Sequence, residues 1–339
     1  MREELITSGR MNPNIDPVLH LWHWQIPFYL FVGGLAAGLL FFAAYNVIMG
    51  KDKTFTTAVK IGPIIALISI VLGLIALVLD LKHPAYFWQL YTTIRLGSPM
   101  SWGAWTLLIV FFINVIWIFT YLKNLFPVFN LKKKFFRKII LFFIKEKEPV
   151  EKLNWEWKYK WLTNFERYSI KNRKAWAWVL IIFALILGVY TGILLSAFNA
   201  RPLWNTSLLG PLFLTSGLST GAALLMILSK THEEKISFSR IDLMLIAIEV
   251  FFIIHLFMGF LAGPEVQAEA ASYFLGGDFT VTFWVNVMLI GLIVPAILES
   301  LELLKFKIPV IIPGILILYG GLMFRFIMVE AGQVIRYLY

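Results

Sequence analysis

The chain of 339 residues is 59% hydrophobic and only 15% charged, far more apolar than a water-soluble domain needs to fill its core. It contains no cysteine, which excludes thiolate iron–sulfur clusters, cysteine zinc sites and disulfides from it. The chain also carries a net charge of +10. Because the chain is so apolar, we interpret its basic residues as signals of membrane topology and of contact with anionic lipid. We therefore expect the lipid bilayer to be its main surrounding, and no nucleic-acid partner.

Eight apolar runs are each long enough to cross a bilayer of about 30 Å as a helix. They are dense in Leu, Ile and Phe without alternating polarity, which favours helices over a barrel. They leave no room for a soluble catalytic domain, so we expect an all-α, integral membrane protein with a single domain over residues 1–339. No cleavable signal peptide is evident, because the first 14 residues are polar and the first apolar run is long enough to span. The expected spans are Pro27–Met49, Val59–Leu81, Trp102–Tyr121, Ala175–Ala197, Pro211–Ser229, Asp242–Leu261, Thr280–Leu304 and Ile308–Val329.

Lysine and arginine gather in alternate connections between these runs. The long segment 122–174 holds 15 of them. Eight more lie in or directly beside the first, fifth and seventh connections, namely Lys51, Lys53, Lys60, Lys230, Lys235, Arg240, Lys305 and Lys307. The positive-inside rule predicts that these connections are cytoplasmic, that both termini are on the outer side, and that the protein resides in the cell inner membrane. The basic loop 122–174, with its apolar patch Phe135–Ile144, is expected either to rest on anionic lipid or to bind a cytoplasmic partner.

Ionisable and aromatic side chains concentrate near the outer side of this predicted topology. A quinone needs a flat apolar slot and donors at its two oxygens that also exchange protons on reduction. An interfacial aromatic belt, which ordinary membrane proteins possess, explains the tyrosines equally well. The candidate quinone-binding residues are His23, Tyr29, Asp80, His83, Tyr190 and Arg201.

Glu249 lies near the centre of the sixth expected span, where an ionised carboxylate costs about 2.5–3.5 kcal/mol. We expect it to face the bundle interior, either as part of a proton path with Asp80 or Arg325 or in a structural hydrogen bond between helices. Glu299, at the inner end of the seventh span, is expected to be interfacial. The two stretches Gly33–Gly38 and Ser216–Gly221 are rich in small residues and predict close helix packing.

Four stretches of sequence resemble the NrfD/PsrC-like family, the membrane anchors of polysulfide reductases and related enzymes. They are WHWQIPFYLFVGGLAAG at Trp22–Gly38, SPMSWGAW at Ser98–Trp105, YTGILLSAFNARPLWN at Tyr190–Asn205 and PLFLTSGLSTG at Pro211–Gly221.

The resemblance implies eight helices, a quinone pocket near the outer surface and electron exchange with an extrinsic subunit. That subunit would be a four-cluster ferredoxin-like iron–sulfur protein on the outer side, accompanied by a molybdopterin catalytic subunit. Tyr190 and Tyr29 match positions that contact menaquinone or ubiquinone in relatives, some of which have His at the place of Tyr29, so His23 is an alternative donor. The resemblance implies no haem and no iron–sulfur cluster in this chain, and no catalytic or metal-binding residue is assigned.

Two other functions stay open from the residues. A cytochrome b-type haem anchor would use His23 or His20 together with His83 or His255 as axial ligands. An ion or solute transporter would line its pathway with Glu249 and Arg325, and proton pumping coupled to quinone chemistry would combine both ideas.

Overall fold

The computed structural model describes residues 22–128, 140–150 and 153–335. Within these ranges eight helical runs are long and apolar enough to cross a membrane, which confirms the expected number. The runs are α1 (Gln25–Ile48), η2 and α2 (Thr57–Ile61 and Gly62–Asp80), α4 (Pro99–Leu125), α7 (Arg173–Ser196), α8 (Leu209–Leu228), α9 (His232–Ala262), α11, η4 and α12 (Thr280–Phe283, Trp284–Ile293 and Val294–Leu303), and α13 (Ile311–Val334).

The largest difference from the expected boundaries is at α9, which begins at His232 rather than Asp242. Thr231 caps it by accepting a hydrogen bond from the backbone N–H of Glu234, at 3.3 Å. The acidic residues Glu233 and Glu234 in its first turn suit the positive end of the helix dipole. The polar start is therefore a continuation of the helix beyond the apolar run, which hydropathy alone does not reveal.

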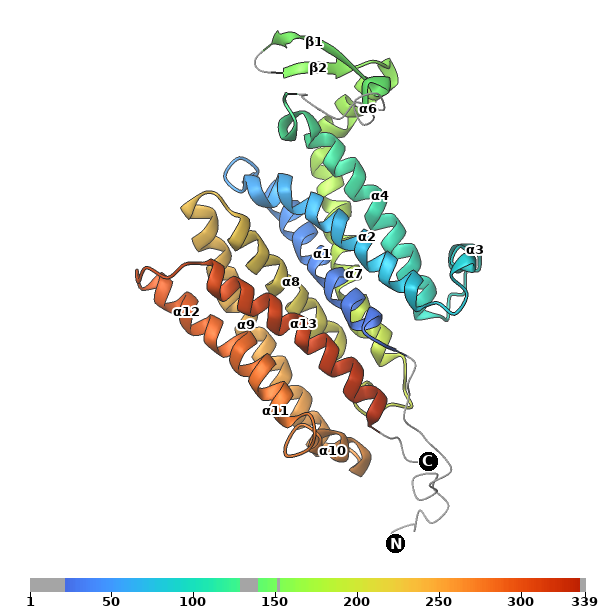
Figure 1. Ribbon diagram of the computed structural model, residues 1–339, viewed down its shortest axis with the longest axis vertical. Coiled ribbons are helices and arrows are strands. Elements are labelled where there is room, and N and C mark those ends of the chain that lie inside the picture. Colours follow the sequence, from blue (N-terminus) through green and yellow to red (C-terminus); the bar gives the residue numbers. More distant parts are fainter. Residues whose placement is uncertain (1–21, 129–139, 151–152, 336–339) are drawn as a thin grey trace.

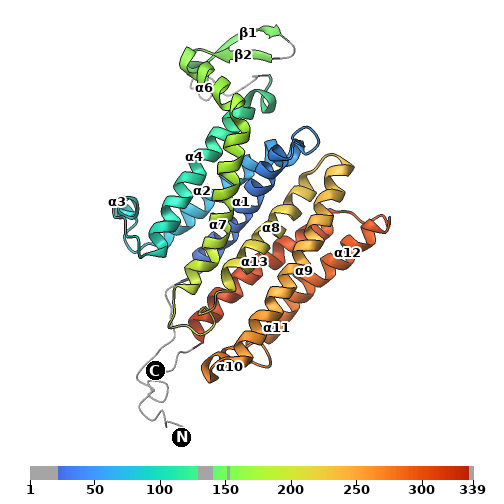
Figure 2. The same cartoon turned by 180° about the vertical axis from the view of Figure 1, so that it is seen from behind.

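The spans form two groups of four (Figures 1 and 2). In the first group, α1 packs against α2 and α7, and α4 packs against α2 and α7. In the second group, α8 packs against α9, and α13 packs against α8 and the η4–α12 run. Because α1 also contacts α8 and α13, it is the most enclosed of the described spans.

Glycines bring α1 and α8 into backbone contact at the junction of the two groups. A Cβ placed on Gly38 would overlap the carbonyl of Gly217, and a Cβ on Gly221 would lie 2.8 Å from the Cα of Gly38. These residues belong to the two stretches of small residues, so the expected close packing is confirmed. The approach leaves no space for a methyl group on either side.

The connections rich in lysine and arginine gather at one end of the bundle, together with β1 (Ile144–Val150), β2 (Leu153–Trp157) and α6 (Lys160–Lys171). The opposite end, called here the α3 end, carries the short elements η3 (Pro84–Tyr86), α3 (Gln89–Thr92) and α10 (Glu265–Ser272). The described ends of the protein also meet at the α3 end, where the backbone of Trp22 exchanges two hydrogen bonds of 2.9 Å with the Gln333 side chain. Within the described residues, this arrangement separates the basic connections from the first and last described residues of the chain, as the charge pattern predicts.

The basic loop folds onto the C-terminal end of α4. β1 and β2 pair antiparallel, the indole of Trp155 donates to the carbonyl of Phe126 at 2.7 Å, and Lys123 forms an ion pair with Glu166 at 2.7 Å. The helix α6 is amphipathic, and Trp161 and Tyr168 on it are exposed. Half of the apolar patch Phe135–Ile144, namely residues 135–139, lies outside the described residues.

Candidate functional site

Two buried tyrosines from different helices meet toward the α3 end of the bundle. Tyr29, near the start of α1, is 3% exposed, and Tyr190, in the second half of α7, is 8% exposed. Their phenol groups interact with each other. A phenol can both donate and accept a hydrogen bond, so the pair offers polar atoms within an otherwise apolar seam.

Glycines on the neighbouring helices leave the space that the two rings occupy, and these glycines are called here the seats of the rings. A Cβ placed on Gly103 of α4 would overlap the Tyr190 ring, and one placed on Gly73 of α2 would lie 3.2 Å from Tyr29 Cδ2. Gly103, Tyr190 and Tyr29 come from three of the four stretches that carry the family resemblance. The first four spans, which are distant in sequence, therefore each supply one part of a single site.

Three further polar groups lie at the α3 end of the bundle, beyond the tyrosine pair, and are called here the rim of this site. Tyr91 on α3 is half-buried and acts electrostatically on Tyr29. Burial raises the pKa of Tyr91, so its hydroxyl is a neutral donor at pH 7. His23, exposed just before α1, interacts with Asp80 at the end of α2. The structure thus places His23 and Asp80 together at the α3 end of the bundle.

Two other sequence-predicted residues have different surroundings. His83 is exposed in front of η3, with its ring 6.4 Å from that of Tyr86. Arg201 donates to the backbone carbonyls of Gln333 at 3.4 Å and Ile335 at 3.2 Å. Arg201 therefore joins the connection between α7 and α8 to the end of α13, which is a structural contact.

The imidazole of His255, an axial ligand in the haem-anchor alternative, is exposed on the surface of α9. Its Nδ1 lies 2.8 Å from the carbonyl oxygen of Phe251, and the two rings are in contact. The ring is thereby oriented along its own helix. His20, the other candidate on the first span, lies outside the described residues.

A second polar constellation fills the seam between α8, α9 and α13. Arg325 is fully buried and donates to the hydroxyl of Ser216, to the carbonyl of Gly321 at 2.9 Å and to that of Phe213 at 3.3 Å. Its charge acts on Glu249, which is 3% exposed and also interacts with Ser216. Glu249 thus faces the bundle interior, with a cation and a hydroxyl beside it.

Two carboxyl groups deeper in the same seam were not predicted as a site. Asp242 and Glu299 are both 0% exposed and interact with each other, so the expectation that Glu299 is interfacial is wrong. Within the described structure, none of their four carboxyl oxygens has a hydrogen-bond partner of standard geometry. A signal was available in the sequence, because Asp242 and Glu249 are seven residues apart and so lie on one face of a helix.

The acidic groups form a continuous series toward the basic end of the bundle. Glu299 interacts with Glu302, and Glu302 with His232 and Lys235. These last three residues line a cavity of about 700 Å³ at the basic end. The series therefore runs from an open cavity, through Asp242, to the buried Glu249 and Arg325.

Eight apolar helices with a tyrosine pair and an acidic series in their seams define a multi-pass helical membrane protein. The family described as "Polysulphide reductase, NrfD" matches residues 11–336. The protein is 30% identical over 328 residues to Protein NrfD of Escherichia coli (strain K12), covering 92% of this sequence and 95% of that protein. It is 29% identical to a polysulfide reductase chain of Wolinella succinogenes, covering 92% and 94%. It is 25% identical to a selenate reductase subunit of Mesobacillus selenatarsenatis, covering 92% and 74%.

The protein belongs to the NrfD family. The match extends over the last three spans, which lie beyond the four stretches of resemblance. It includes both the tyrosine pair and the acidic series.

Proposed function

We propose that this protein is the membrane anchor subunit through which a respiratory oxidoreductase exchanges electrons with the quinone pool. The quinone head group, of menaquinone or ubiquinone, would bind at Tyr29 and Tyr190. The names of two relatives describe each of them as one component of a reductase, which supports a role within a complex rather than as an autonomous enzyme.

The observation that carries this proposal is the tyrosine pair with its glycine seats. A quinone offers two carbonyl oxygens that accept hydrogen bonds, and phenols are suitable donors. The glycines at positions 73 and 103 let the rings sit deep between helices, where the surrounding is apolar. His23 and Asp80 at the rim are suited to exchange the protons that quinone reduction takes up or quinol oxidation releases.

The partner would be an extrinsic iron–sulfur subunit on the α3 end of the bundle, accompanied by a molybdopterin catalytic subunit. With the basic connections cytoplasmic, this end lies on the outer side of the inner membrane. The tyrosine pair is near this end, so the electron path from the quinone to a docked cluster would be short.

The acidic series would carry protons between the basic end and the bundle centre. Two carboxyl groups that face each other away from water favour a state in which at least one is protonated. The pair Asp242 and Glu299 can thus hold a proton, and Glu249 with Arg325 would be the next station. Asp80, at the outer end, would exchange protons on that side.

The quinone site is tested with Tyr190→Phe and Tyr29→Phe in the purified protein reconstituted in lipid. Each change keeps the ring and removes one donor, which costs about 0.5–1.5 kcal/mol and weakens binding of a quinone analogue about two- to twelvefold. Tyr45→Phe, at the basic end of α1, is the matched control and should bind as wild type does. Unchanged analogue affinity in both test variants would show that the pocket is misplaced.

The proton path is tested with Glu249→Gln and Asp242→Asn, with the exposed Glu233→Gln as control. Both test variants should bind the quinone analogue normally but slow quinone-coupled proton uptake into vesicles. Infrared difference spectra on quinone reduction should lose a carboxyl band in each. Normal proton uptake and unaltered spectra in both variants would show that these carboxyl groups have only a structural role. Impaired ion uptake without any quinone effect would instead favour a transporter.

A further inference from the structure

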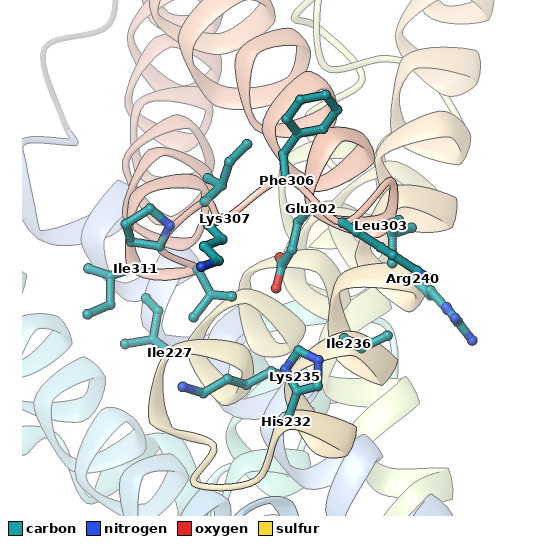
Figure 3. Close-up of a pocket in the computed structure, with 14 residues that line it drawn as sticks. Ile227, His232, Lys235, Ile236, Arg240, Glu302, Leu303, Phe306, Lys307 and Ile311 are labelled. Atoms are coloured by element: carbon teal, nitrogen blue, oxygen red, sulfur yellow. The ribbon is translucent and has the colours of Figure 1, made fainter.

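The cavity at the basic end combines a charged wall with an apolar one. It has a volume of about 700 Å³ and lies between the start of α9, the end of α8 and the turn from α12 to α13. Figure 3 shows Glu302 and Lys307 on one side of this space and His232 and Lys235 on the other, with Arg240 at its edge. The apolar lining comes from Ile227, Ile236, Leu303, Phe306, Ile308, Pro309, Val310 and Ile311.

The charge around the cavity is strongly positive. Four basic residues line the cavity, namely Lys235, Arg240, Lys305 and Lys307, whereas Glu302 is the single acid that lines it. In the described part of the protein, none of these four cations forms an ion pair within 4.0 Å. Glu302 interacts electrostatically with Lys235 and His232, and none of the ion pairs among the described residues involves it. A surplus of positive charge is therefore left for an anion to neutralise.

The apolar surroundings favour an anion that carries hydrocarbon. Phe306, which lines the cavity, is 60% exposed, and Leu304, two residues before it, is 70% exposed. An apolar groove of about 370 Å³ lies between α9 and the η4–α12 run, further toward the bundle centre. On α9, Arg240 and Ile246 are six residues apart, a rise of about 9 Å along a helix. An acyl tail extending inward from the cavity would meet this groove, which is lined by Ile246, Val250, Leu292, Ile293, Ala296, Ile297, Ser300 and Leu301.

We propose that the cavity binds the phosphate-bearing head group of an anionic phospholipid. Lys235 and Lys307, on opposite walls, would contact the phosphate, and the acyl tails would cover the apolar groove. Basic pockets between membrane helices near a charged membrane surface are suited to such head groups. The site is separate from the tyrosine pair and does not depend on quinone chemistry. The bound lipid would hold the α12–α13 turn against the start of α9.

The full-length protein is reconstituted in nanodiscs of mixed phosphatidylglycerol and phosphatidylcholine. After the protein is gently released from the nanodiscs, native mass spectrometry measures which lipid stays bound to it. Wild type should retain phosphatidylglycerol preferentially. Each Lys→Gln change at Lys235 and Lys307 should lower that preference about fivefold. The control pair Lys51→Gln and Lys53→Gln removes the same charge at the same end, away from the cavity, and should keep the preference.

Charge-preserving variants keep the proposal falsifiable if the glutamine variants misfold. Lys235→Arg together with Lys307→Arg should retain phosphatidylglycerol as wild type does. Equal losses in the test and control pairs would mean that general surface charge, rather than this cavity, selects the lipid. Displacement of the lipid by millimolar inorganic phosphate would identify a site for free anions, and both outcomes would overturn the proposal.

Discussion

Replacing Gly103 by Ala should displace the Tyr190 ring. A Cβ at position 103 would overlap the Cζ and the hydroxyl of Tyr190, so the ring must tilt away or the helices α4 and α7 must separate. Overpacking of this kind costs about 1–3 kcal/mol, offset in part by the better helix propensity of Ala, worth about 0.5–1 kcal/mol. The net result should be a modest loss of stability.

The effect on quinone binding tests the proposed site more directly than the effect on stability does. If Tyr190 donates to a quinone oxygen as proposed, a displaced hydroxyl would lose that bond, and analogue affinity should fall about two- to twelvefold. Titration of a quinone analogue in lipid nanodiscs measures this, and thermal unfolding in detergent measures the stability. Gly97→Ala is the control, because a Cβ there has no neighbour within 4 Å.

A double-mutant cycle separates displacement of the hydroxyl from general damage. In the Tyr190→Phe background the donor is already absent, so Gly103→Ala should add little further loss of affinity. Full additivity of the two losses would refute the idea that Gly103 acts through the Tyr190 hydroxyl. So would wild-type affinity in the Gly103→Ala variant.

Three further outcomes are expected. Gly38→Ala places a methyl group against the carbonyl of Gly217 and should destabilise the α1–α8 contact by about 1–3 kcal/mol, seen as easier unfolding in mixed detergent. Trp204→Phe removes the donor to the carbonyl of Met328, a bond of 2.8 Å, and should cost about 1–3 kcal/mol because the acceptor stays buried, measured by thermal unfolding against wild type. A reporter fused after Tyr339 should be active on the outer side of the membrane, and activity in the cytoplasm would reverse the proposed topology.

The eight spans could be predicted because the length of an apolar run is a direct requirement of the bilayer. The boundaries were less predictable where the helix continues through polar residues, as at His232. The tyrosine pair was found because Tyr29 and Tyr190 lie in recognisable stretches. Their seats on Gly73 and Gly103 could not be assigned, since a glycine shows that something approaches closely without showing what.

The acidic series illustrates the limit of arguments from depth alone. Glu299 is near the end of an apolar run, where a carboxylate usually reaches the surface, but it turns inward to Asp242. Which way a side chain faces depends on the helices packed around it, and the contact between α9 and α12 is not encoded in either segment separately. Only the spacing of Asp242 and Glu249 hinted at one polar face on α9.

Both polar sites contact α1, because Tyr29 belongs to this helix and Arg325 packs against it, and this gives a physical reason to expect communication between them. Tyr29 and Gly34 are five residues apart on α1, a rise of about 7.5 Å. A Cβ on Gly34 would lie 3.2 Å from Arg325 Nη2, so the guanidinium rests directly against α1. Close packing between α1 and α8 makes this helix a stiff connection. We therefore expect a ligand that moves Tyr29 to be sensed at Arg325, and through it at Glu249, without a large rearrangement of the bundle.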